Sequence, residues 1–328
     1  MGKLAVSYSQ IKKWRQCKQA HYYAYIERLE PRMKPRPLKM GSVIHDMLEA
    51  KARGKDWTEI LHKVQKEFDK MFVEEKELYG DIPSDAEKIM KAYERMYGED
   101  DEIDYLLIEE KMGPIDLTDK TALTLRPDAL VRDRDQGLIY LMERKTAQRL
   151  PTEDFRLWDL QTLIYAWALR KLGYQVDGVL WDHVRSKPPT EPQVLKSGEL
   201  SQAKKIDTDY YTYYEAIKEN GLDPEKYSEF LEKLKGRERN FFRRVRLPVK
   251  EKMIKPLIKD AQEASLEIYY MQHRPQRNIS PFTCKSCFYK SLCYAELRGL
   301  DDNFIRENEF KVKEGGDDED VSEEEAEE

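Results

Sequence analysis

The residues with the clearest capacity for chemistry are two carboxylates and a lysine near the middle of the chain. Glu143 and Lys145 close a strand-like apolar run over residues 138–142. Residues two apart in a strand point to the same face of a sheet, so their side chains are expected to project together. Asp128, fifteen positions before Glu143, can join them from a neighbouring strand. This combination predicts a magnesium-dependent site that hydrolyses phosphodiesters.

The short pattern also has a plain alternative, a solvated hairpin with a surface ion pair, because the chain is 37% charged. Its residues, Pro127-Asp128 followed by Glu143-Arg144-Lys145, resemble the signature of the PD-(D/E)XK nuclease superfamily. The resemblance implies that the backbone carbonyl of Arg144 is a further metal ligand. Arg144 is larger than the usual middle residue of that motif, and Leu125 stands where the family often has glycine. These two departures remove no ligand.

A helix is predicted to follow the motif, because apolar residues recur at helical spacing between residues 155 and 172. Gln161 and Tyr165 are four apart and share one face of that helix. RecB-type nucleases of the superfamily are similar, and the resemblance implies two roles. Gln161 would help to order the attacking water and the substrate, and Tyr165 would lie beside the DNA backbone. The alternative is an ordinary amphipathic helix.

His45 lies in a Gly-x-x-x-His pattern that begins at Gly41. This pattern also resembles RecB-type nucleases and implies an imidazole metal ligand, which suits manganese better than magnesium. The alternative is a packing histidine on an amphipathic helix. Family members often have another acidic residue on the first strand, here Glu109 or Glu110. Only one of two adjacent strand residues can face inward, and the sequence does not select between them.

Four cysteines, Cys17, Cys284, Cys287 and Cys293, suggest a metal centre. One remote cysteine with a C-terminal triplet resembles the iron–sulfur centre of AddB-type and CRISPR-associated exonucleases, which implies a 4Fe-4S cluster. The alternatives are a zinc site and four unrelated buried thiols. No signal peptide is apparent at residues 1–4. The expected location is therefore the cytoplasm of a bacterial or phage-infected cell, where thiols stay reduced.

Charge is distributed unevenly along the chain. Residues 314–328 contain ten acidic and no basic residues, so the remaining chain has 57 basic and 53 acidic residues, a net charge of +4 against -6 for the whole. Such acidic blocks are disordered and often act as interaction tails. We expect this tail to compete with DNA for a basic cleft, to dock a recombination or replication protein, or merely to solubilise the chain. Mean hydropathy is -0.81 and no apolar run approaches eighteen residues, which excludes a predicted membrane span.

The predicted organisation is an α/β fold, in which a central mixed sheet is flanked by helices in a restriction-endonuclease-like core with helical insertions. The expected parts are an N-terminal helical region (1–100), the nuclease core (101–200), a second helical region (201–313) and the disordered tail (314–328). The expected helices cover residues 7–28, 41–76, 84–97 and 201–275. The expected strands cover residues 105–112, 122–131, 138–145 and 176–184.

The region 201–275 contains an aromatic and basic mixture. Its tyrosines are expected to be helix-core residues; they are Tyr210, Tyr211, Tyr213 and Tyr214. Its clustered arginines are predicted to bind phosphate, because close cations repel one another without an anionic partner; they are Arg243, Arg244 and Arg246. No Gly-x-x-x-x-Gly-Lys loop is present, so no ATPase is expected.

The sequence therefore predicts a metal-dependent DNA exonuclease that uses Mg²⁺ or Mn²⁺ and acts on DNA ends or single strands, in recombination, repair or phage DNA processing. One alternative is a DNA-end-binding component of a recombination or helicase complex, with weak or partner-regulated nuclease activity. A second alternative is a zinc-stabilised scaffold without a catalytic role.

Overall fold

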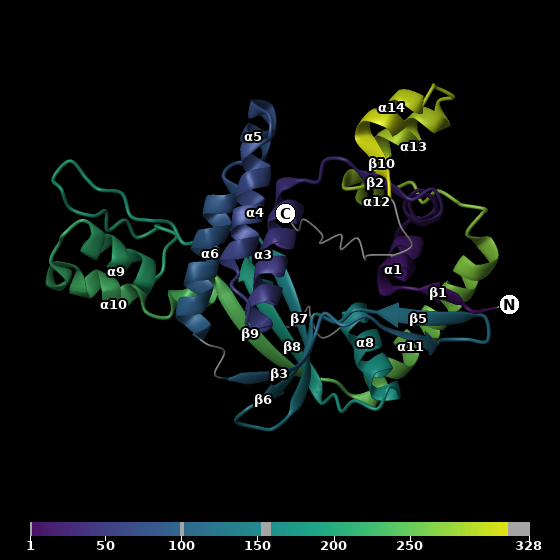
Figure 1. Ribbon diagram of the computed structural model, residues 1–328, viewed down its shortest axis with the longest axis horizontal. Coiled ribbons are helices and arrows are strands. Elements are labelled where there is room, and N and C mark those ends of the chain that lie inside the picture. Colours follow the sequence, from purple (N-terminus) through teal and green to yellow (C-terminus); the bar gives the residue numbers. More distant parts are fainter. Residues whose placement is uncertain (1, 99–101, 152–158, 314–328) are drawn as a thin grey trace.

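A five-stranded mixed sheet forms the centre of the computed structural model, which describes residues 2–98, 102–151 and 159–313 (Figure 1). Its strand order is β3-β6-β7-β8-β9. The strands are β3 (Ile103–Ile108), β6 (Ala129–Asp133), β7 (Ile139–Ala147), β8 (Gly178–Arg185) and β9 (Phe242–Pro248). Only β7 and β8 pair in parallel, and the other neighbours are antiparallel. The mixed sheet that was predicted from the sequence is confirmed.

Helices cover both faces of the sheet because β7 and β8 are apolar on both sides. Leu141 and Val179 pack in a core with the helices α8 (Leu160–Lys171) and α11 (Glu251–Met271). On the opposite face, Val184 packs in a core with α3 (Arg36–Ala52) and α6 (Ile82–Tyr97). Two further helices, α4 (Thr58–Asp69) and α5 (Val73–Tyr79), lie between α3 and α6 in the chain. The helical region predicted over residues 41–76 is confirmed, and three separate helices share it.

The expected single strand 122–131 is also wrong, since the chain breaks it at residues 126–128. Strand β5 (Thr121–Leu125) belongs to a second sheet of order β1-β5-β4, with β1 (Leu4–Val6) and β4 (Met112–Asp116). Strand β6 begins just after this break, in the central sheet. Pro127 has no N–H to donate to a strand ladder, so a break at this position is physically reasonable. Asp128 consequently stands at the junction of the two sheets.

Cys17 interrupts the helix expected over residues 7–28. It adopts an extended conformation between α1 (Tyr8–Gln16) and α2 (Lys18–His21), and a π-helical turn (Tyr22–Ile26) follows. The chain then forms β2 (Leu29–Pro31).

Residues 201–275 are not uniformly helical. They contain α9 (Tyr210–Glu219), α10 (Ser228–Leu234) and two 3-10 turns (Pro224–Tyr227 and Arg237–Asn240), and then strand β9 of the central sheet before α11. Tyr213 is buried, and Tyr210 and Tyr214 pack beside it, whereas Tyr211 is exposed. The core role predicted for the tyrosines is confirmed for three of the four.

The C-terminal segment returns to the N-terminal region. It comprises α12 (Pro281–Lys285), α13 (Lys290–Leu297), α14 (Asn303–Glu309) and β10 (Phe310–Val312), which pairs with β2 in an antiparallel ladder. The predicted acidic tail, residues 314–328, lies outside the described residues. Within the described ranges, no helix combines the length and apolarity needed to cross a membrane.

Candidate active site

Asp128 is held rigidly at the junction between the two sheets. The backbone amide of Arg144 on β7 donates a hydrogen bond of 2.6 Å to its Oδ2, and its own carbonyl accepts one of 3.1 Å from the amide of Glu109. Burial alone would raise the pKa of Asp128, but His45, Lys145 and the Arg144 amide together lower it to about 2. The carboxylate is therefore ionised at neutral pH.

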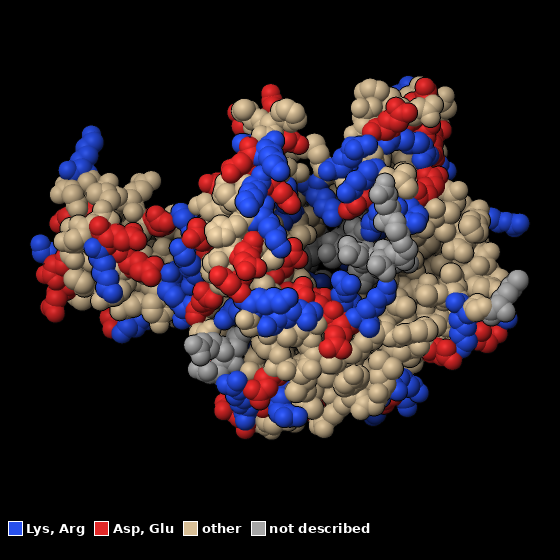
Figure 2. All heavy atoms as spheres, viewed as in Figure 1, with Lys and Arg blue, Asp and Glu red and all other residues tan. Residues whose placement is uncertain are grey.

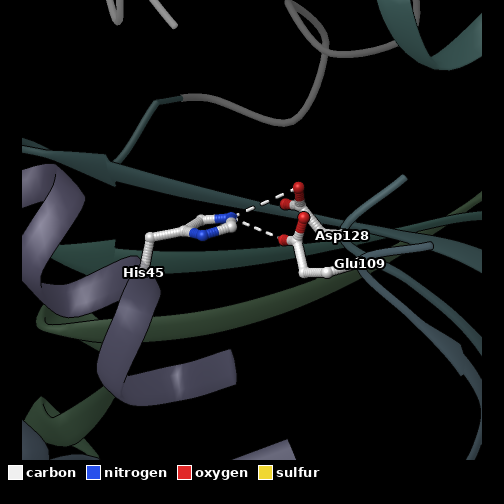
Figure 3. A group of neighbouring side chains, drawn as sticks. All are labelled: His45, Glu109 and Asp128. Atoms are coloured by element: carbon white, nitrogen blue, oxygen red, sulfur yellow. Dashed lines mark ion pairs between the residues drawn. The ribbon is translucent and has the colours of Figure 1, made fainter. Parts of the chain in front are cut away.

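Glu109 and His45 complete a compact group with Asp128 (Figure 3). His45 Nε2 lies 3.2 Å from Asp128 Oδ1 and 3.5 Å from Glu109 Oε1. One possible ligand atom from each residue lies within 4.8 Å of the others. Glu109 follows the last residue of β3 with a φ of 48°, a left-handed conformation that departs from the strand. The next residue, Glu110, is exposed. Of the two glutamates between which the sequence could not select, Glu109 is therefore the one that faces the site.

The shared charge of this group changes the protonation of its members. Burial lowers the pKa of His45, but the carboxylates of Asp128 and Glu109 outweigh it and raise that pKa to about 9. Burial and the Asp128 carboxylate raise the pKa of Glu109 to about 7. The imidazolium of His45, together with Lys145, therefore stabilises the ionised form of Asp128.

Glu143 and Lys145 lie on the same face of β7, as strand alternation predicts. Lys145 Nζ is 2.8 Å from Glu143 Oε1, and the Glu143 carboxylate is 1% exposed. Burial and Asp128 raise the pKa of Glu143 to about 8, although Lys145 opposes that shift. Among the described residues, the compact group of possible metal ligands consists of His45, Glu109 and Asp128 and does not include Glu143. The predicted ligands are therefore divided between two neighbouring sets.

The side chain of Arg144 points to the reverse face of β7. Strand register aligns it with Asp182 on β8 and Arg244 on β9. Asp182 lies 3.9 Å from Arg144 Nε and 3.6 Å from Arg244 Nε, and it accepts a hydrogen bond of 2.5 Å from Tyr93 on α6. This buried row was not predicted, although an aspartate inside the apolar run of β8 was a signal for it.

The three arginines predicted to bind phosphate have partners within the chain. Arg244 lies against Asp182, and Arg246 pairs with Asp133 at 2.9 Å. Arg243 donates to the carbonyl of Pro151. The prediction is corrected for Arg244 and Arg246, because their anionic partners are carboxylates of the protein itself. Arg243 is held by a neutral backbone carbonyl.

The two residues predicted on the helix after the motif have different positions. Both lie on α8, whose first turn is capped by the side chain of Asp159. Tyr165 is 1% exposed and packs edge-to-face against Tyr8, so it is a core residue and does not offer its ring to a DNA backbone. Gln161 is partly exposed at the start of the helix, and its role remains a prediction.

The donor set at the junction fits a divalent cation. It combines one imidazole nitrogen with carboxylate oxygens. Mn²⁺ accepts both kinds of ligand, whereas Mg²⁺ is bound mainly by the oxygens. Two buried carboxylate atoms, Glu109 Oε1 and Glu143 Oε2, have no hydrogen-bond partner among the described residues. Buried acceptors without donors are costly, and a cation would satisfy them.

None of the four cysteines forms a disulfide within the described residues, and all four are partly exposed. Cys17, Cys287 and Cys293 pack against one small apolar cluster, although they come from opposite ends of the chain. The backbone amide of Asn278 lies 3.5 Å from Cys17 Sγ, which fastens the two regions together. Within the described ranges, no three cysteine sulfurs lie as close together as the ligand atoms of the junction group.

Comparison with known proteins places these features in a family. No curated protein matches the chain. A family model for the PD-(D/E)XK nuclease superfamily matches residues 5–294, a span that includes both the junction group and the motif on β7. The mixed sheet with flanking helices is consistent with the fold of that superfamily. The chain therefore belongs to the PD-(D/E)XK nuclease superfamily.

Proposed function

We propose that the protein is a divalent-metal-dependent deoxyribonuclease of RecB type that acts as an exonuclease on DNA ends or single strands. Superfamily membership supports metal-dependent phosphodiester hydrolysis. The observation that carries the proposal is the convergence of His45, Glu109 and Asp128 beside the ion pair of Glu143 and Lys145. A role in recombination, repair or phage DNA processing follows from the same resemblance.

The proposed chemistry assigns a separate task to each set of residues. His45, Glu109 and Asp128 hold the cation, with Glu143 and the carbonyl of Arg144 as further ligands. When bound, a divalent ion polarises the scissile phosphate and lowers the pKa of water. The remaining residues act on the substrate and the water.

Lys145 is the positive donor of the site. Its ammonium is oriented by the Glu143 carboxylate at 2.8 Å, so it is fixed before substrate arrives. A preorganised cation of this kind stabilises the negative charge that develops on the phosphoryl oxygens in the transition state. Gln161, at the start of α8, is proposed to orient the attacking water.

A degradation assay tests this proposal. Single- and double-stranded DNA, labelled at either the 5′ or the 3′ end, is incubated with protein in Mg²⁺ and in Mn²⁺. We expect stepwise loss of label from one end, and no cleavage by Asp128→Ala, Glu143→Ala or Lys145→Ala with DNA binding retained. Glu110→Ala is the matched control, because this exposed carboxylate lies outside the group. Wild-type protein that binds ends but leaves them intact in Mn²⁺ would instead support a DNA-end-binding component.

We further propose that the four cysteines hold a 4Fe-4S cluster of structural function. Four cysteines from both ends of the chain, three of them on one apolar cluster, support this assignment. Anaerobically purified protein should be brown and contain about four iron atoms per chain. Cys17→Ser should lose iron and lower Tm, whereas Ser291→Cys should leave iron unchanged. Stoichiometric zinc in place of iron would contradict the cluster.

A further inference from the structure

A positively charged surface lies where the two ends of the chain meet. β2 and β10 form a two-stranded ladder, in which Lys311 is opposite Glu30, and the chain continues from β2 into α3. We call Arg32, Lys34, Lys39 and Lys311 the basic ribbon. Figure 2 shows Lys and Arg side chains gathered along the upper rim of the hollow between the α3–α5 helices and the α12–α14 region.

One carboxylate serves two cations of the basic ribbon. Glu30 lies 3.1 Å from Lys34 Nζ and 3.3 Å from Lys311 Nζ. The Glu30 side chain is largely covered, at 16% exposure, whereas Lys311 is 55% exposed. A single negative charge cannot neutralise both ammonium groups, so positive charge remains on the solvent side of this ladder.

The other two members of the basic ribbon are held by neutral groups. Arg32 Nε donates a hydrogen bond of 3.2 Å to the carbonyl of Glu307. The ammonium of Lys39 lies 4.8 Å from the centre of the Tyr79 ring. These contacts orient the two cations without cancelling their charge, unlike Arg244 and Arg246 of β9, which face carboxylates of their own chain.

Two acidic side chains that flank β2 and β10 in the sequence have other partners. Glu27 pairs with Arg306 at 2.5 Å, and Glu309 accepts a hydrogen bond of 2.5 Å from Ser291. The net positive field of the ribbon is therefore available to an external anion. A surface of one charge sign beside a hollow concentrates a polyanion near it.

Helix α3 links this surface to the active site. The helix begins at Arg36, directly after Arg32 and Lys34, and it carries both Lys39 of the ribbon and His45, nine residues after its start. At about 1.5 Å per residue, nine residues correspond to roughly 14 Å along the helix axis. That distance equals about four nucleotides of a B-form strand.

We propose that the basic ribbon binds the phosphate backbone of the same DNA strand that is cut at the junction group, a few nucleotides from the scissile bond. This inference rests on the proposed function, since it assumes a DNA strand at the active site. Binding by the ribbon would not depend on the DNA sequence, because its cations would contact phosphates and not base edges. It would retain the strand between successive cuts.

The test compares two triple variants with equal loss of charge. The ribbon variant is Arg32→Gln, Lys34→Gln and Lys311→Gln. The control is Lys204→Gln, Lys226→Gln and Lys233→Gln, three exposed lysines of the insertion that carries α9 and α10. Binding of a fluorescein-labelled single-stranded oligonucleotide is measured by anisotropy over a range of NaCl, without divalent metal.

The ribbon variant should bind more than tenfold more weakly at low salt. Its slope of log affinity against log salt should fall by about 2, since each phosphate that a cation no longer neutralises lowers the slope by about 0.7. The control should follow the wild type. If the triple variant does not fold, the single variant Lys39→Gln replaces it, because this change leaves the Glu30 ion pairs intact. Its salt slope should be lower than that of the wild type by about 0.7.

Superimposed curves for the ribbon and control variants would overturn the inference. The degradation assay reports independently on the proposed function. A wild type that cuts no DNA would refute that function, whereas the salt slopes would still decide whether the ribbon binds phosphates.

Discussion

Two adjacent glutamates after β3 have opposite environments, and this difference supports the ligand role proposed for Glu109. Glu109 lies 3.5 Å from His45, whereas Glu110 is exposed. Glu109→Gln removes an anionic oxygen ligand, so it should weaken Mn²⁺ binding by at least tenfold, which corresponds to about 1.4 kcal/mol. His45→Ala should have a similar effect, and its activity should partly return at high Mn²⁺. Isothermal titration with Mn²⁺ measures the binding of both variants.

Glu110→Gln is the control for that comparison, since it removes the same charge one residue away. Equal Mn²⁺ affinities for Glu109→Gln and Glu110→Gln would show that Glu109 is not a ligand.

His21 is a buried histidine outside the active site and gives a pH-dependent stability. It is 1% exposed and packs between Trp14 and Tyr25, with ring centroids at 5.1 Å and 4.9 Å. Burial, with a smaller contribution from Lys13, lowers its pKa from 6.5 to about 4. Between these values the unfolded chain binds the proton and the folded chain does not. Folding stability from this residue is therefore complete above pH 6.5 and is lost as the pH falls towards 4.

The size of this effect follows from the pKa difference. At about 1.4 kcal/mol per pH unit, His21 should account for up to about 3 kcal/mol of lost stability between pH 7 and pH 4. His21→Phe should remove that part of the pH dependence in urea unfolding curves. His62→Phe, on the exposed side of α4, is the matched control. An unchanged pH profile for His21→Phe would contradict the burial argument.

At the scale of the elements, three strands are joined by a row of buried charges. Arg144 on β7, Asp182 on β8 and Arg244 on β9 are aligned by the strand register, and Tyr93 of α6 closes the row. The backbone amide of Arg144 also donates a hydrogen bond to the carboxylate of Asp128. The row therefore contacts, from its reverse face, the strand that carries Glu143 and Lys145.

Removing the central carboxylate should be costly because it leaves two buried guanidinium groups uncompensated. Asp182→Asn should lower the free energy of unfolding by about 3–5 kcal/mol. Asp104→Asn is the control, since its ion pair with Arg134 is exposed and should contribute at most about 1 kcal/mol. Urea unfolding measures both variants. Equal destabilisation by the two substitutions would show that the buried row does not support the sheet.

At the scale of the whole molecule, the two ends of the chain meet in one region. β10 pairs with β2, and Cys17 packs in the same apolar cluster as Cys287 and Cys293. The acidic residues 314–328 follow β10 closely in the sequence, and Lys311 of the basic ribbon lies on that strand. Their charge is therefore attached close to the surface proposed to bind DNA.

Deletion of residues 314–328 changes the formal charge from -6 to +4. The shortened protein should bind DNA more tightly, because ten competing negative charges are removed. The difference should shrink as salt increases, since exposed charges are screened beyond about 8–10 Å at physiological ionic strength. Anisotropy titrations at low and high NaCl measure it. Equal affinities at low salt would assign the tail to solubility or to a protein partner.

Local spacing in the sequence was sufficient for the features that lie within one element. A period of two places Glu143 and Lys145 on one face of β7, and a period of 3.6 predicts α8. It was not sufficient for features that depend on which elements meet. The approach of His45 on α3 and the choice of Glu109 over Glu110 arise from contacts between distant segments.

The arginines of β9 show the same limit, because their clustering is visible in the sequence but Asp182 and Asp133 become partners of Arg244 and Arg246 only in the folded sheet. Backbone geometry directs a side chain within its own element, whereas burial and long-range pairing decide what it faces.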